Sequence, residues 1–60
     1  MNGAELKAWR RKVRLTQRQL AEMLGIPALT ISGWETNRVQ IKRPLMLSLA
    51  LRALEAELAK

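Results

Sequence analysis

The chain has 60 residues and contains no Cys, His, Asp or Tyr, so disulfides, thiolate zinc sites and imidazole metal sites are excluded. With five scattered Glu as its only acids, no nucleophile can be paired with a base, and we expect no enzyme, no catalytic residue, no metal and no cofactor. A net charge of +6 on so small a domain points to a polyanion. The longest uncharged run, Met23–Trp34, is too short to span a bilayer.

The first predicted helix runs from Ala4 to Arg14. Leu6, Trp9 and Val13 recur at spacings of three and four, which places them on one buried stripe. A neighbouring face carries three basic residues: Lys7, Arg11 and Arg14.

The start of a second helix is predicted at Thr16. Thr16 and Gln19 have the spacing of a capping box, in which each side chain accepts the other's free backbone N–H, and Leu15 and Leu20 are placed as a hydrophobic staple. Gly25 is a suitable left-handed residue for the end of this helix. The segment is therefore a short helix followed by a tight turn.

A third helix is predicted to open with Pro27 in its first turn, because the fixed φ of proline suits that position. Ile31 and Trp34 face inward, and Asn37 can leave the helix in a left-handed conformation. The segment ALTISGW in this helix has no charged residue. Residues 16–36 thus predict a helix, a turn and a second helix.

A fourth helix is predicted over about residues 44–58, with more apolar surface than one core requires. One stripe, expected to face the other helices, contains Leu47, Ala50, Leu51, Leu54 and Leu58. The other contains Leu45, Met46, Leu49, Ala53 and Ala56. A second copy of the chain is the expected cover for this second stripe, since twofold dimers are the commonest assembly; the alternative is cover by Met1–Ala4.

The surplus of positive charge lies in the first 43 residues, which hold nine Lys or Arg and three Glu, whereas residues 44–60 hold two of each sign. Nucleic acid is the expected partner. An anionic membrane surface and simple solubility are the alternatives, but the membrane suits the chain poorly because its basic and most apolar segments are separate.

The runs LTQRQLAEMLGIPALTISGWETNR and RPLMLSLALRAL, together with Leu6 and Arg10, resemble the Cro and phage-repressor (Xre-type) helix-turn-helix family. The resemblance covers about residues 4–58. It implies an all-α, compact, lambda-repressor-like domain of four or five helices over residues 1–60. It also implies a partly buried ion pair between Arg10 and Glu35.

The same resemblance assigns residues to DNA. It places the third helix in the major groove, with base reading by Ala28, Leu29, Ser32, Gly33 and, from the following loop, Arg38. The expected phosphate-binding residues are Gln17, Arg18, Thr30, Thr36, Asn37, Lys42, Arg43, Arg11 and Arg14. The helix departs from the usual pattern, because none of its four reading positions can form a bidentate bond to a base. If they contribute little, specificity comes from the loop or from DNA shape.

We therefore expect a cytoplasmic, sequence-specific regulator of double-stranded DNA, a repressor or autorepressor that binds an inverted repeat as a homodimer. The size resembles that of phage or mobile-element regulators, among them Cro-like repressors, antitoxin-type autorepressors and anti-CRISPR-associated regulators. The alternative function is an antitoxin-type or other protein-binding module with the same fold.

Overall fold

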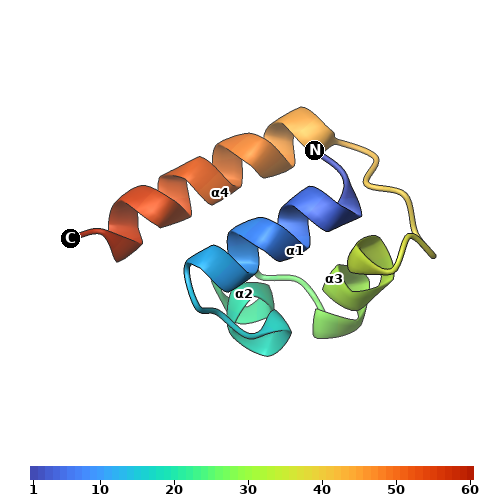
Figure 1. Cartoon of the computed structure of the whole chain (residues 1–60), viewed down its shortest axis with the longest axis horizontal. Coiled ribbons are helices and arrows are strands. Elements are labelled where there is room, and N and C mark those ends of the chain that lie inside the picture. Colours follow the sequence, from blue (N-terminus) through green and yellow to red (C-terminus); the bar gives the residue numbers. More distant parts are fainter.

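The computed structural model describes all 60 residues and contains four helices and no strand. They are α1 (Gly3–Lys12), α2 (Gln17–Leu24), α3 (Ala28–Glu35) and α4 (Pro44–Leu58). In Figure 1, α1 lies between α4 on one side and α2 and α3 on the other. The prediction of an all-α, four-helix architecture is confirmed, with no fifth helix. None of the helices has the length and hydropathy needed to cross a membrane.

Two capping boxes fix where the first helices begin. The predicted one joins Thr16 and Gln19: the Gln19 N–H donates to Thr16 Oγ1 at 3.0 Å, and the Thr16 N–H donates to Gln19 Oε1 at 2.9 Å. A second box, which we did not predict, joins Asn2 and Glu5 at the start of α1. It moves that helix start to Gly3, ahead of the predicted Ala4.

Three helices end through the same backbone arrangement, with a left-handed residue after the last turn. Gly25 at φ 73° and Asn37 at φ 61° adopt the predicted conformation. Arg14 at φ 62° is the unpredicted third case. Its N–H donates to the Arg11 carbonyl, and the next N–H, that of Leu15, donates to the Arg10 carbonyl at 3.0 Å. The first helix therefore ends at Lys12 instead of continuing to Arg14.

Proline marks two further helix starts. Pro44 occupies the first turn of α4, where its missing N–H costs nothing. The prediction that Pro27 lies in the first turn of α3 is wrong. Pro27 precedes the helix, in an extended conformation at ψ 142°. Its carbonyl accepts the Thr30 N–H at 3.0 Å. The rigid ring therefore fixes the angle at which the chain enters α3.

The core consists of six apolar side chains drawn from all four helices: Leu6, Leu20, Ala21, Ile31, Leu47 and Leu51. Trp9 and Trp34 pack against this cluster as predicted, and both stay partly exposed. The Trp9 indole N–H also donates to Glu55 Oε1 at 3.1 Å, which ties α1 to α4. Six residues form a small core, so these polar ties matter to how the helices are held.

The two stripes of α4 are separated as predicted, except at one residue. Leu47 and Leu51 are buried and Ala50 and Leu54 half-buried, whereas Leu58 is exposed where the helix extends past the rest of the molecule (Figure 1). All five residues of the second stripe are exposed: Leu45, Met46, Leu49, Ala53 and Ala56.

The alternative cover for that second stripe, the segment Met1–Ala4, lies elsewhere. Gly3 is buried against the end of α3, so closely that a Cβ there would collide with the Trp34 carbonyl oxygen. Met1 borders a hollow with Trp34 and Ile41. The N-terminal segment therefore covers the end of α3 and leaves the outer face of α4 open, so this alternative is wrong.

Candidate nucleic-acid interface

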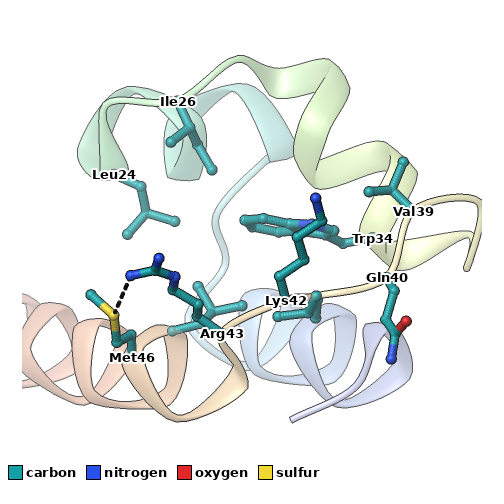
Figure 2. A pocket seen from close by; sticks show the side chains of 10 residues that line it. Leu24, Ile26, Trp34, Val39, Gln40, Lys42, Arg43 and Met46 are labelled. Carbon is teal, nitrogen blue, oxygen red and sulfur yellow. Dashed lines mark hydrogen bonds between the residues drawn. The ribbon is translucent and has the colours of Figure 1, made fainter.

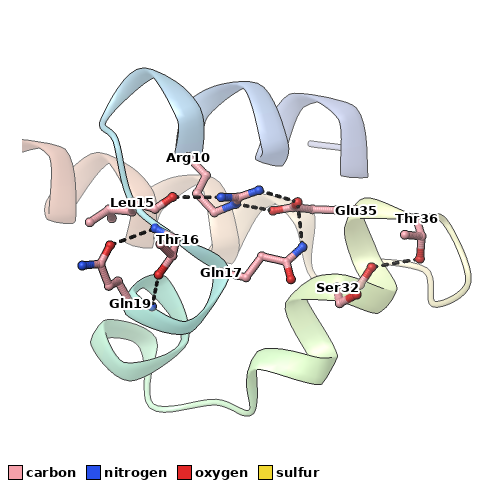
Figure 3. A network of polar contacts seen from close by, with 8 residues as sticks. All are labelled: Arg10, Leu15, Thr16, Gln17, Gln19, Ser32, Glu35 and Thr36. Atoms are coloured by element: carbon pink, nitrogen blue, oxygen red, sulfur yellow. Dashed lines mark hydrogen bonds and ion pairs between the residues drawn. The ribbon is translucent and has the colours of Figure 1, made fainter.

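Glu35 is the centre of a polar network that joins three helices (Figure 3). Arg10 from α1 donates to both of its oxygens, from Nε to Oε2 at 2.8 Å and from Nη2 to Oε1 at 3.0 Å. Gln17 at the start of α2 donates from Nε2 to Oε1 at 3.1 Å. The predicted ion pair is therefore confirmed. One carboxylate fixes the end of α3 against both α1 and α2.

This network shifts the ionisation of its charged members. Burial, which leaves 2% of the Glu35 side chain exposed, raises the pKa of its carboxyl, but the hydrogen bonds from Arg10 and Gln17 and the charges of Arg10 and Lys7 outweigh burial. The net result is a lowered Glu35 pKa. The hydrogen bond to Glu35 raises the pKa of Arg10. Both groups are therefore charged in the folded protein at neutral pH.

The outer face of α3 is uncharged and differs from one predicted reading position to the next. Leu29 is the most open, with 76% of its surface exposed. Ser32 is half-buried, and Ala28 is also half-buried because it packs against the core. Of the four helical positions, Leu29 and Ser32 remain the accessible ones that do not belong to the core packing.

The fourth position, Gly33, is buried and does not face outward, so its predicted placement on the reading surface is wrong. Val39 from the following loop covers it. A Cβ built on Gly33 would lie 3.0 Å from Val39 Cγ2. Glycine is therefore used here to let the loop approach the helix. The sequence signal we missed is an apolar valine inside a basic loop.

The loop between α3 and α4 is bound to the end of α3. The Gly33 carbonyl accepts the N–H groups of Arg38 and Val39 at 3.0 and 3.1 Å. The Thr36 hydroxyl donates to the Ser32 carbonyl at 2.9 Å (Figure 3). Arg38 Nε in turn donates to Thr36 Oγ1 at 3.3 Å. The guanidinium of Arg38 is thus held beside the C-terminal end of α3.

Most predicted phosphate-binding cations are free within the chain. Arg18 is within 3.7 Å of Glu22, but the others are exposed and make no ion pair: Arg11, Arg14, Lys42 and Arg43. Among the uncharged candidates, Thr36 and Asn37 are exposed and Thr30 is half-buried. The side-chain amide of Gln17 donates one hydrogen bond to Glu35. Its second amide hydrogen and the backbone N–H of Gln17 at the start of α2 remain available as donors.

A groove of about 480 Å³ lies between the end of α2, the loop and the start of α4 (Figure 2). Its walls are mostly apolar, with Leu24, Trp34 and Met46 among them, and two cations, Lys42 and Arg43, belong to its lining. Arg43 directs one guanidinium nitrogen toward Met46 Sδ at 3.8 Å. We did not predict this groove, since it arises from how the loop spans between elements.

The family model described as Helix-turn-helix matches residues 6–60. Comparison with curated proteins and with solved structures gave no significant match. The matched residues include the capping box of α2, the left-handed Gly25 and the Arg10–Glu35 pair. The family consists of DNA-binding regulators and is generally non-enzymatic. The chain belongs to the Xre-type (lambda Cro-type) helix-turn-helix family of DNA-binding proteins.

Proposed function

We propose that the protein is a sequence-specific regulator of double-stranded DNA that inserts α3 into the major groove and represses transcription by occupying a promoter. The observation that carries this proposal is the uncharged outer face of α3, which the Glu35 network holds in place, in a chain whose exposed cations are mostly unpaired. Positive charge serves beside phosphates, whereas the groove floor is read with hydrogen bonds and methyl contacts.

Base reading is assigned to a composite surface of helix and loop. Leu29 can pack on thymine methyl groups, Ser32 can exchange one hydrogen bond, and Ala28 adds a partly exposed methyl. Arg38 is the one residue of this surface that can make a bidentate bond to guanine. Because Gly33 is covered by Val39, it acts through the position of the loop.

Phosphate binding is assigned to polar and cationic residues outside this composite surface. Their free donors are guanidinium and ammonium groups, hydroxyls and amides, from Gln17, Arg18, Thr30, Thr36, Asn37, Lys42, Arg43, Arg11 and Arg14. The start of α2 adds unpaired backbone N–H groups and the positive end of its dipole. Such contacts set register on the duplex and carry no sequence information.

We further propose that the active species is a homodimer on an inverted repeat. The exposed stripe of α4 supports this, because three large side chains in it are mostly solvent-exposed, Leu45, Met46 and Leu49. A dimer of this class places two recognition helices about 34 Å apart, one turn of B-DNA. Two recognition helices with few base contacts each, joined in one dimer, recognise a longer DNA sequence than either helix does alone.

Selection of duplexes from a random pool tests this function directly. The expected result is an enriched inverted repeat with half-sites about one helical turn apart, bound with an affinity that falls steeply with salt. Enrichment of a single half-site would support DNA binding but contradict the proposed homodimer. If random duplex shows no salt-sensitive binding even at low salt, DNA binding is wrong. The apolar groove beside Trp34 would then favour the second candidate, a protein-binding module.

A further inference from the structure

The outer face of α4 has the composition of an interface core. Leu45, Met46 and Leu49 are 72%, 61% and 54% exposed, and Ala53 and Ala56 continue the stripe toward the C-terminal end. No charged residue interrupts it, whereas an exposed helix face is normally charged. Loss of charge at the centre of a patch, with charged residues at its edges, is typical of protein interfaces.

The side chains along this face of α4 are regularly spaced and change from large to small toward the C-terminal end. Met46, Leu49, Ala53 and Ala56 follow one another at intervals of three, four and three residues, the repeat of a coiled-coil seam. The two large side chains come first and the two small ones last. The first half of the seam therefore projects as a ridge, and the second half leaves room for one.

We propose that a second copy of the chain packs on this face with its α4 antiparallel, so that the ridge of each copy fills the space of the other. Met46 then faces Ala56 of the partner subunit, and Leu49 faces Ala53 of the partner subunit. The midpoint of 46 and 56 is 51, and the midpoint of 49 and 53 is also 51, so one twofold axis satisfies both pairs. This register rests on the homodimer proposed above.

Packing favours the antiparallel arrangement over a parallel one. A parallel pair would set large side chains against large and Ala against Ala, which holds the helices apart at one end and leaves a gap at the other. The antiparallel pair sets large against small at both ends and also opposes the two helix dipoles.

The charged residues at the edges of this face of α4 do not favour one orientation consistently. The antiparallel register brings Arg43 to Glu57 of the partner subunit twice, and places the two copies of Arg52 near each other across the axis. A parallel pair would instead join Arg52 to Glu57 of the partner subunit. Exposed ion pairs of this kind contribute little to stability, so packing decides the orientation. Because Arg52 has a different neighbour in each orientation, its substitution can distinguish the two.

Disulfide trapping tests the orientation, and the chain has no Cys of its own to interfere. Met46→Cys and Ala56→Cys variants are oxidised separately and as an equimolar mixture. In the proposed register two Met46→Cys thiols lie about ten residues apart along the helices, roughly 15 Å at 1.5 Å per residue, beyond disulfide reach. We expect a covalent dimer from the mixture and none from either variant alone. Ala8→Cys, exposed on α1, is the control that stays monomeric in the gel.

Each other outcome overturns a defined part of the proposal. A covalent dimer from Met46→Cys alone would establish a parallel pair. A mixture that does not cross-link, although sedimentation shows dimers, would move the interface to another face. If sedimentation of the unmodified chain shows only monomers, the homodimer itself is wrong. Because a cysteine could perturb packing, Arg52→Ala provides an independent measurement: the dimer should dissociate no more readily than the unmodified chain, and weaker association would favour the parallel pair.

Discussion

Arg10 and Glu35 face each other across the α1–α3 contact with two parallel hydrogen bonds, 2.8 and 3.0 Å long. The side chains are 13% and 2% exposed, so water screens the pair little. Arg10 also donates from Nη1 to the Leu15 carbonyl at 2.8 Å, at the turn that leads into α2. The guanidinium thus anchors both helices of the DNA-binding unit to α1.

Removal of Arg10 should therefore be strongly destabilising. Arg10→Met leaves the buried Glu35 carboxylate without its counter-charge, and breaking such a pair costs about 3–5 kcal/mol. Denaturant unfolding at one fixed protein concentration measures the loss. Lys12→Ala is the matched control, because its 3.3 Å pair with Glu55 is exposed on both sides and its loss should be within a few tenths of a kcal/mol. Equal losses for the two variants would contradict the structural role of Arg10.

The lowered pKa of Glu35 predicts how stability depends on pH. A carboxyl with a lower pKa in the folded state than in the unfolded state contributes stability that is complete above its unfolded pKa of about 4.3. This stability is lost as the pH falls through the folded pKa. We expect the free energy of unfolding to decline below about pH 4.5. Glu35→Gln, less stable at pH 7, should decline less steeply; an equal slope in both proteins would exclude Glu35 as the cause.

Gly33→Ala should report the contact between α3 and the loop. Alanine gains about 1 kcal/mol over glycine inside a helix, but its Cβ would meet Val39 Cγ2 at 3.0 Å. The two effects should nearly cancel in the unmodified chain. In a Val39→Ala background the obstacle is absent, and the same substitution should stabilise by about 1 kcal/mol. Thermal unfolding of the four proteins measures this difference, and identical effects in both backgrounds would show that Val39 exerts no pressure on this site.

Arg38 and Arg43 should differ in what they contribute to DNA binding. Arg38→Ala should reduce the preference for the selected sequence by removing a base contact worth about 1–3 kcal/mol. Arg43→Ala should weaken all sequences alike and reduce the slope of affinity against salt by about one unit. Binding titrations on selected and scrambled duplexes at several salt concentrations separate the two, with Lys60→Ala as a control cation. A uniform loss for Arg38→Ala would make it a phosphate contact.

Leu49→Glu should separate dimerisation from folding. A carboxylate in the centre of the α4 stripe would be buried against apolar surface in the dimer, whereas in the monomer it remains exposed as Leu49 is. We expect monomers in sedimentation, unchanged helix content and loss of tight operator binding. Leu58→Glu changes an exposed leucine of the same helix outside the stripe and should stay dimeric. A dimer that survives Leu49→Glu would place the interface elsewhere.

Local sequence signals predicted the parts of the fold that depend on neighbouring residues. The Thr16–Gln19 box and the left-handed Gly25 involve residues a few positions apart, so spacing was enough to find them. The Arg10–Glu35 pair spans 25 positions and followed only from the family resemblance. The reading positions Leu29 and Ser32 followed from the same source, and their contact with DNA stays a prediction.

The errors occurred where distant backbone contacts override local preference. Arg14 has no left-handed signal of the kind Gly25 carries, and it adopts that conformation because the α1 end and the α2 start must join there. The family resemblance placed Gly33 among the outward helix positions, but Val39, six residues later, folds back over it. Leu58 fits the inner stripe by spacing, but the body it would pack against ends before it.

Thr36, Arg38 and Val39 pack over the end of α3, so that helix and loop differ in how freely their residues can be changed. The helix is committed to the packing of its neighbours, and few of its positions can change without disturbing the fold. The loop carries no such obligation at Arg38, whose side chain is solvent-exposed yet tethered. If Arg38 reads bases as proposed, substitutions at this one loop position should change the preferred DNA sequence while the helical scaffold is left intact.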